Sequence, residues 1–176
     1  MKRLTTVLSL VIVAVLMTSC KNNSLQGYLV ESQEKQGFIT VDLPVSFLEL
    51  KDQDVSDDVK ATVKSIKKIN VVALPYKNNE DAYEVEKEKL TKILGGEDYK
   101  TLMKMNAKGM KVSLYYTGNS DAIDEVIAFG YSKEAGVGIA RLLGDDMNPA
   151  MIIEMMQNIK IDPSNVSLGS LNAVFK

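Results

Sequence analysis

Acidic side chains with the spacing of metal ligands are concentrated in one stretch, which contains Asp52, Asp54, Ser56 and Asp57. Clustered carboxylates are the ligands that hard cations such as Ca²⁺ prefer, so this stretch is a candidate calcium loop. Such a loop needs glycine at its sixth position and a bidentate glutamate at its twelfth, whereas this sequence has Asp57 and Val63 there. The cluster therefore indicates a solvated loop whose acids favour the start of the following helix.

A nucleophilic serine is the second candidate, because Ser65-Ile-Lys-Lys68 has the Ser-x-x-Lys spacing of penicillin-recognising enzymes. Their Lys-Thr-Gly strand corresponds here only to Tyr116-Thr-Gly118, in which the lysine is replaced, and their Ser-x-Asn element is missing. The chain has no histidine and a single cysteine, Cys20, which excludes imidazole-based triads and zinc sites. The sequence therefore predicts no catalytic, cofactor-binding or metal-binding residue, and it leaves a carboxylate-based hydrolase as the enzymatic alternative.

Three tyrosines are the candidate residues for contact with a partner. Tyr115, Tyr116 and Tyr131 lie in segments that alternate between apolar and polar residues, and this alternation places Tyr115 and Tyr116 on opposite faces of a strand. If helices cover one face of the sheet, one of these two rings points outward, where it can contact a partner. Ordinary strand composition is the alternative interpretation.

The N-terminus has the organisation of a bacterial export signal. Lys2 and Arg3 precede an uncharged, mostly apolar run over residues 4–17, which is shorter than the roughly eighteen residues of a membrane-spanning helix. Thr18 and Ser19 then stand directly before Cys20, the only cysteine.

This junction resembles a bacterial lipobox, with Met17 at a position where leucine is usual. The resemblance implies a signal peptide over residues 1–19, lipidation of Cys20 and a short tether over residues 20–24. Two or three acyl chains on Cys20 would anchor the protein stably in a membrane. No aspartate follows Cys20, unlike the known inner-membrane retention signal of lipoproteins, and no acidic run follows it, unlike a known surface-export signal. Resemblance to lipoprotein sorting therefore favours an outer-membrane lipoprotein that faces the periplasm.

The charge balance argues against nucleic acid as a partner. Removal of residues 1–19 takes away Lys2 and Arg3 and no acid, which leaves 19 basic and 23 acidic groups and a formal charge of −4. A mildly acidic surface suits solubility and has no basic excess for phosphate backbones. The expected partners are therefore the membrane, through the lipid, and an envelope protein or a small ligand.

The order of periodic segments predicts a single α+β domain over residues 25–160, followed by a tail over 161–176 that is either an extra strand or loose. Apolar residues at helical spacing predict helices at 25–36, 44–50, 55–66, 80–94, 99–105 and 149–159. Alternating or compact apolar runs predict strands at 38–43, 69–76, 111–116, 123–131 and 137–143. The expected fold is an antiparallel sheet of four or five strands, including a C-terminal three-strand meander, with helices mainly on one face.

Short segments of this pattern resemble a known family. They are Tyr99-Lys-Thr-Leu102-Met103 leading to Lys111-Val-Ser-Leu-Tyr115, then Ile123-Asp-Glu125-Val-Ile, and Leu142-Leu-Gly144-Asp145 before the last helix. Over roughly residues 37–157 the chain resembles the Bacteroidetes family of lipoproteins catalogued as domain of unknown function 4252. The resemblance implies the α+β fold and a place in the bacterial envelope, and it carries over no functional residue.

These observations together favour a membrane-anchored envelope lipoprotein that binds a ligand or a partner without catalysis. The alternatives are an accessory component of an envelope stress or sigma-factor signalling system and, with less support, the carboxylate-based hydrolase.

Overall fold

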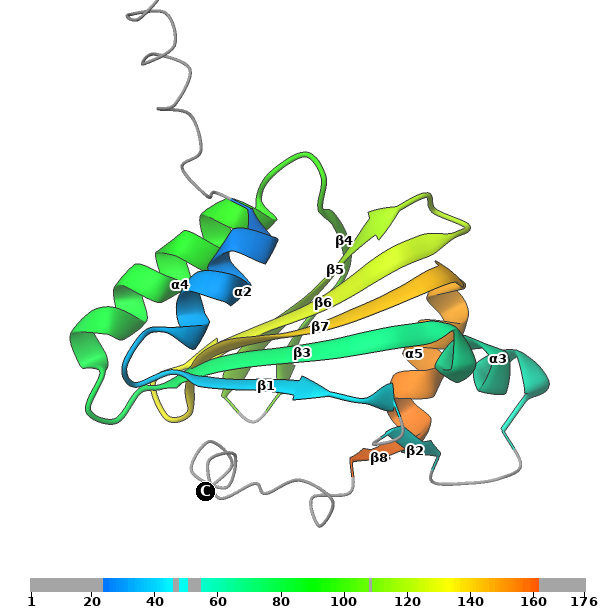
Figure 1. Ribbon diagram of the computed structural model, residues 1–176, viewed down its shortest axis with the longest axis horizontal. Helices are drawn as coiled ribbons and strands as arrows, with labels where there is room; N and C mark the ends of the chain where they lie inside the picture. Colours follow the sequence, from blue (N-terminus) through cyan, green and yellow to red (C-terminus); the bar gives the residue numbers. More distant parts are fainter. Residues whose placement is uncertain (1–23, 46–47, 51–54, 108, 162–176) are drawn as a thin grey trace, which may run out of the picture.

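The computed structural model describes residues 24–45, 48–50, 55–107 and 109–161. Four α-helices and eight β-strands follow one another in this part of the chain (Figure 1). In chain order they are α2 (Leu25–Gln33), β1 (Ile39–Leu43), β2 (Leu48–Leu50), α3 (Asp57–Ser65), β3 (Ile66–Pro75), α4 (Glu80–Leu94), β4 (Lys100–Ala107), β5 (Met110–Gly118), β6 (Ile123–Ser132), β7 (Gly136–Met147), α5 (Pro149–Asn158) and β8 (Ile159–Ile161).

The centre of the fold is a six-stranded antiparallel sheet with the strand order β1-β3-β7-β6-β5-β4. Strands β4 to β7 are neighbours both in sequence and in the sheet, so they form a meander, and β3 and β1 extend the sheet beyond β7. The α+β class and the C-terminal meander are confirmed. The predicted number of four or five strands is wrong, because the meander has four strands and the sheet six.

The missed strand is β4, whose sequence was predicted as a helical piece at 99–105. Leu, Met and Lys are good helix formers, and the apolar residues of this stretch also fit helical spacing. In the structure Met103, Met105 and Ala107 lie opposite Leu114, Val112 and Met110 of β5. Tertiary pairing with β5 therefore overrides the local preference.

A second correction concerns Leu48–Leu50, predicted as part of a brief helix. These residues form β2, which pairs with β8 in a separate two-stranded sheet. Residues 46–47 of the predicted helix and residues 162–176 of the predicted tail lie outside the described residues, so the packing of the tail stays a prediction.

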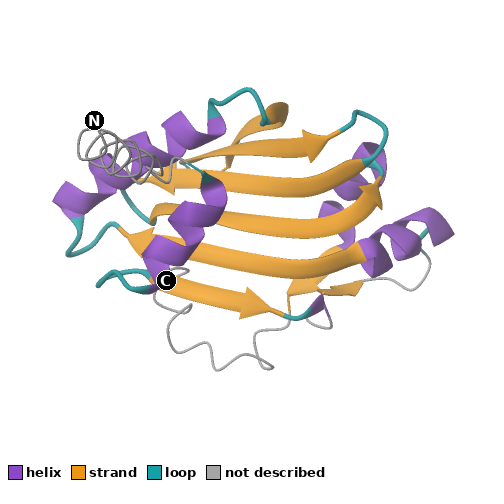
Figure 2. Ribbon diagram, turned by 45° about the horizontal axis from the view of Figure 1, so that its top comes forward, coloured by secondary structure: helices purple, strands orange, loops and turns teal. Residues whose placement is uncertain are grey.

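The helices cover both faces of the sheet, so the prediction of helices mainly on one face is wrong. On one face, called here the α2/α4 face, both helices pack on Val72, Leu74, Ile127 and Phe129. On the other, the α3/α5 face, Val59 and Ile152 of the two helices pack with Ile69 and Val126. Because successive residues of a strand point to opposite faces, two separate apolar clusters form. Figure 2 shows the helices on either side of the strands.

Local sequence signals fix the helix ends. The side chains of Ser24, Ser56 and Asn148 each accept a hydrogen bond from a backbone N–H in the first turn of α2, α3 and α5. Helix α4 has the predicted bounds, and its stripe of Tyr83, Leu90, Ile93 and Leu94 is buried. None of the helices in the described ranges is long and apolar enough to cross a bilayer.

Candidate functional site

An open groove lies on the α2/α4 face, between α4 and the strands β4, β5 and β6. Its volume is about 460 Å³. We call it the tyrosine–lysine groove after its main lining residues, which are Thr91, Lys104, Lys111, Tyr115, Phe129 and Tyr131. Asn106 and Ser113 complete its polar lining.

The register of the sheet explains why these side chains meet. Lys104 lies opposite Ser113, which lies opposite Phe129. In the next row towards the strand ends, Asn106 lies opposite Lys111, which lies opposite Tyr131. Residues directly opposite each other in an antiparallel sheet share a face. The two rows therefore present lysine, amide, hydroxyl and aromatic groups side by side on the α2/α4 face.

The aromatic side of the groove is packed against α4. The rings of Phe129 and Tyr131 lie 5.3 Å apart between centroids, tilted by 37°. The Lys87 ammonium of α4 lies 5.9 Å from the centroid of Tyr131 and 5.4 Å from that of Tyr83. Lys87 also pairs with Glu84, and this hydrogen bond is the main cause that raises the pKa of Lys87 above its usual range. These contacts hold the Tyr131 ring in place at the groove.

The structure brings together two of the three tyrosines proposed from the sequence. Tyr115 and Tyr131 line the groove, both partly buried. Tyr116 lies on the opposite face, where it packs against the α3/α5 cluster and has the Lys100 ammonium 5.6 Å from its ring centroid. One partner surface therefore cannot contain all three rings. Cys20, the predicted lipidation site, lies outside the described residues.

Sequence reasoning missed the lysines of the groove. Lys104 stood in a segment predicted as a helix, and Lys111 was read only as a polar residue of a strand. The available signal was the alternation of Met103, Met105 and Ala107 with the polar residues Lys104 and Asn106, which matches an edge strand as well as a helix. A bulge between Thr101 and Met103 then sets which β4 residues join which face.

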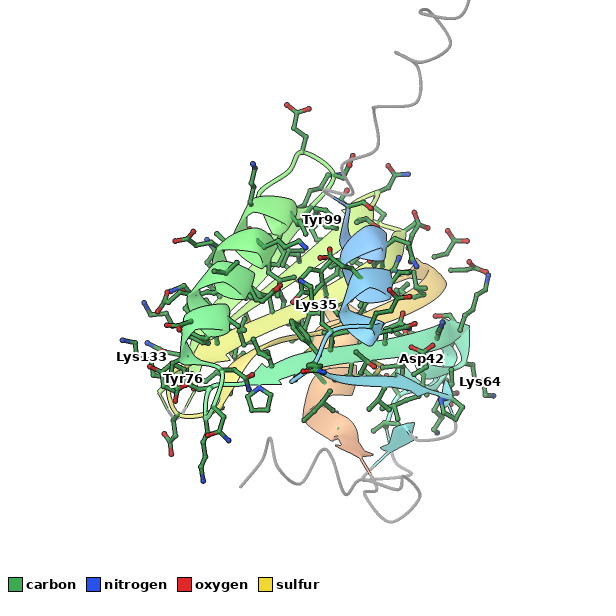
Figure 3. The ribbon with its side chains drawn as sticks, turned by 60° about the vertical axis from the view of Figure 1, so that its left-hand side comes forward. Lys35, Asp42, Lys64, Tyr76, Tyr99 and Lys133 are labelled. Carbon is green, nitrogen blue, oxygen red and sulfur yellow. The ribbon has the colours of Figure 1, made fainter. Side chains whose placement is uncertain are left out.

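The serine motif does not assemble a nucleophile. The Ser65 hydroxyl donates a hydrogen bond to the Thr62 carbonyl at 2.8 Å, within α3. Lys68 belongs to β3 and pairs with Asp42 at 2.9 Å. Figure 3 shows Asp42 on β1. The hydroxyl and the ammonium are thus engaged with different partners, and nothing in their contacts joins them.

A polar depression of about 350 Å³ lies between α3 and α5. It holds two carboxylates, Asp58 and Asp146, beside Thr62, Ser65 and Asn148. The Thr62 hydroxyl donates to the Asp58 carbonyl at 2.9 Å, and Asn148 caps α5. Both side chains thus serve the helices. No group of three or more potential metal ligands occurs among the residues with described positions.

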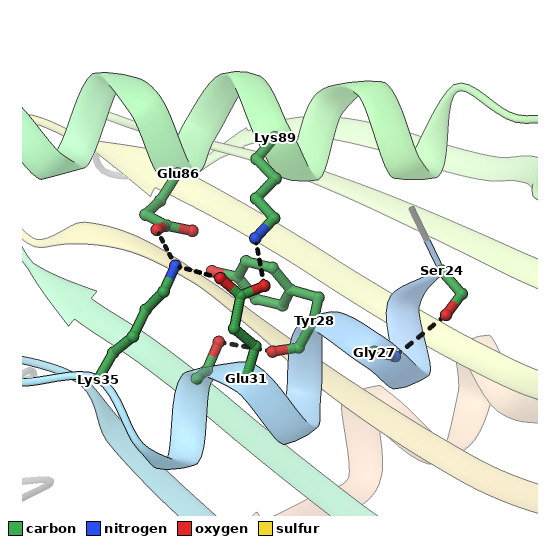
Figure 4. A network of polar contacts seen from close by, with 8 residues as sticks. Ser24, Gly27, Tyr28, Glu31, Lys35, Glu86 and Lys89 are labelled. Atoms are coloured by element: carbon green, nitrogen blue, oxygen red, sulfur yellow. Dashed lines mark hydrogen bonds and ion pairs between the residues drawn. The ribbon is translucent and has the colours of Figure 1, made fainter. Parts of the chain in front are cut away.

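A partly exposed network of charged side chains joins α2 to α4 (Figure 4). The Lys35 ammonium lies 2.7 Å from Glu86 Oε1 and 3.0 Å from Glu31 Oε1, and Lys89 contacts the other Glu31 oxygen at 2.5 Å. Figure 3 shows Lys35 between the two helices.

Hydrogen bonds from Lys89 and Lys35 lower the pKa of Glu31. Burial first, and then the charge of Glu86, raises the pKa of Tyr28 far above its usual range, so this phenol stays neutral. The network connects the two helices. Glu86 lines neither the tyrosine–lysine groove nor the polar depression between α3 and α5.

The fold and its groove define an α+β protein built on a six-stranded antiparallel sheet, with helices on both faces and an open, carboxylate-free depression on one of them. A family model described as Domain of unknown function (DUF4252) matches residues 28–155, from α2 into α5, and the chain belongs to this family. The resemblance to domain of unknown function 4252 is thereby confirmed, and the attribution to Bacteroidetes lipoproteins stays a prediction. Comparison with curated proteins and with solved structures gave no match.

Proposed function

We propose that this chain is a non-enzymatic binding module of the bacterial envelope, held on a membrane by lipid on Cys20, which takes an anionic ligand in the tyrosine–lysine groove. The observation that carries this proposal is the lining of the groove. Its charged side chains are the two lysines Lys104 and Lys111, and they flank three aromatic rings.

The chemistry of the lining supports an anion with a flat or apolar part. Lys104 and Lys111 are exposed, so their ammonium groups are available to a carboxylate or a phosphate. The amide of Asn106 and the hydroxyl of Ser113 stand in the same two rows and offer further donors. Tyr115 and Tyr131, which are partly buried, provide the aromatic surface on which a ring or a sugar face stacks, and the buried Phe129 packs against Tyr131.

The proposal that the function is non-enzymatic rests on the types of side chain that line the groove. General acid–base catalysis needs a group with a pKa near the working pH, and this is supplied most often by histidine or by a carboxylate. The groove is lined by neither. The Bacteroidetes lipoprotein resemblance and the lipobox-like junction at Cys20 support the place in the envelope.

The groove is tested by exchanging both of its lysines. The double variant K104Q/K111Q is compared with K64Q/K77Q, which removes the same charge from exposed lysines of α3 and of the β3–α4 turn. Figure 3 shows Lys64 on α3. The probes are a uronic acid trisaccharide, an aromatic carboxylate and a sugar phosphate, each with its neutral analogue, and binding is measured by calorimetry.

At least one anionic probe is expected to bind, with its neutral analogue weaker. K104Q/K111Q should lower this affinity at least about tenfold, because a hydrogen bond to a charged group contributes about 1.5–3 kcal/mol. The control pair should keep the affinity within about twofold, since exposed charges outside the site act weakly. Equal losses in both double variants, or no binding of any anionic probe, would refute the proposed ligand class.

The membrane anchor is tested separately with Cys20→Ser in the whole chain, expressed in a bacterial host that processes lipoproteins. Metabolic labelling with an alkyne fatty acid should mark the unaltered chain and leave the variant unlabelled. The variant should also leave the membrane fraction, because stable anchoring depends on the acyl chains. Asn22→Ser serves as the neighbouring control and should keep both label and location. Membrane retention of an unlabelled Cys20→Ser chain contradicts the anchor.

A further inference from the structure

The α3/α5 face of the sheet is only partly covered by its helices. Helices α3 and α5 pack on the end of this face that carries Leu43, Ile69 and Val126. Beside them an open apolar groove of about 290 Å³ runs over β3, β7, β6 and β5. Its lining contains no charged residue, so covering this surface with apolar side chains is more favourable than leaving it in contact with water.

Side-chain size creates the groove. In one row Ala73 lies opposite Gly138, which lies opposite Gly130, and Val112 of β5 ends the row. The neighbouring row places Ala140 opposite Ala128. The central strands β7 and β6 thus carry alanine and glycine, while bulkier residues flank them. We call this depression the alanine–glycine groove.

The chain returns to this same face just before its last residues. Helix α5 follows β7 and runs beneath the sheet, and β8 lies on that side as well (Figure 1). Residues 162–176 come next, and their only charged residues are Asp162 and Lys176. Between them stand Val166, Leu168, Leu171, Val174 and Phe175. An extended segment of this length reaches up to about 50 Å. Strands β3 and β6, with ten residues each, span only about 33 Å.

We propose that residues 162–176 dock in the alanine–glycine groove of their own sheet, with their apolar side chains over Ala128 and Ala140. An uncharged groove and a segment with charge only at its two ends are complementary. Because the segment is covalently attached on the side of the sheet that carries the groove, its local concentration is in the millimolar range, which favours it over a separate molecule. Docking of a second copy is the competing arrangement.

The absence of tryptophan from the chain makes a direct test available. Phe175→Trp introduces the only indole, in the whole chain carrying Cys20→Ser. Its fluorescence is expected to be blue-shifted and severalfold less quenched by acrylamide than free tryptophan. Adding Ala128→Glu places a charge in the groove and should return both signals to those of a solvated indole. Ala82→Glu, at an exposed position of α4, is the matched control and should change neither.

Three outcomes overturn the proposal: an indole that is solvated without Ala128→Glu, an indole that stays protected with it, or protection that weakens on dilution because a second copy supplies it.

A disulfide test covers the case in which Ala128→Glu does not fold. Ala140→Cys and Ala173→Cys, again with Cys20→Ser, should form an intramolecular bond under mild oxidation, whereas Ala82→Cys with Ala173→Cys should not. Equal yields for the two pairs also refute docking in the groove.

Discussion

Replacement of Glu125 by alanine is expected to destabilise the protein by about 3–5 kcal/mol, because it leaves a buried guanidinium without its counter-charge. The side chains of Glu125 and Arg141 are 11% and 12% exposed, and Arg141 Nε donates to Glu125 Oε1 between β6 and β7. Arg141 Nη1 also donates to Gln26 Oε1 of α2 at 2.7 Å. One cation thus connects β6 and β7, the two central strands of the sheet, to α2.

The control for this prediction is a similar ion pair in water. Lys67 and Asp145 also join two neighbouring strands, but their side chains are 62% and 64% exposed. Asp145→Ala should therefore cost no more than about 1 kcal/mol. Urea unfolding followed by circular dichroism gives both values. Similar losses for Glu125→Ala and Asp145→Ala would show that burial does not govern the Glu125–Arg141 pair.

A compensated double variant separates the loss of the pair from the burial of an unpaired charge. Glu125→Met with Arg141→Leu removes both charges and keeps apolar volume, so it should recover most of the stability lost in Glu125→Ala. The same measurement applies. A double variant less stable than Glu125→Ala would mean that the hydrogen bond to Gln26 outweighs the cost of the buried charge.

Gly136→Ala is expected to cost at least about 3 kcal/mol, since it combines a strained backbone angle with a clash against fixed atoms. Gly136 has a φ of +120°, and a Cβ there would lie 2.1 Å from the Leu74 carbonyl oxygen and 2.8 Å from Pro75 Cα. All of these atoms belong to the backbone of β3, where Pro75 pairs with Gly136. The neighbour cannot rotate away as a side chain would, so the end of the β3–β7 pairing has to open.

Gly109→Ala is the matched control. Gly109 also has a positive φ, of +79°, but a Cβ there would meet no atom within 4 Å. Its cost should be limited to the left-handed conformation, about 1–2 kcal/mol. Thermal and urea unfolding of both variants measure the difference. If Gly136→Ala is no worse than Gly109→Ala, the close approach of β3 and β7 is not what requires glycine at position 136.

The sequence predicts those segments correctly whose apolar periodicity fits only one type of secondary structure. Helix α4 is the clearest case, because a long stripe with charged residues between its members has no competing interpretation. Strands β5, β6 and β7 were found because each alternates or is compactly apolar. The prediction for β4 was wrong because its Leu, Met and Lys residues favour a helix, and only pairing with β5 makes this segment a strand.

The tyrosine–lysine groove could not be predicted from the sequence, for a related reason. Its lysines and rings come from separate strands, so they meet only through the register, and a shift of one residue would move Lys104 or Tyr115 to the other face. The alternation did place Tyr115 and Tyr116 on opposite faces. It could not show that helices cover both faces of the sheet, so it could not select Tyr115 with Tyr131 as the pair that shares a depression.

The strand order also sets an order of events in folding. The pairings within β4 to β7 join segments that follow one another directly, so each closes a short loop. The pairing of β3 with β7 instead brings Ile66 to Gly144, across α4 and the first three strands of the meander. The chain must give up more entropy for that closure than for any hairpin of the meander. A chain that is still folding therefore has an unpaired β7 edge until β3 pairs with it, and during that interval the protein is most exposed to association with other chains.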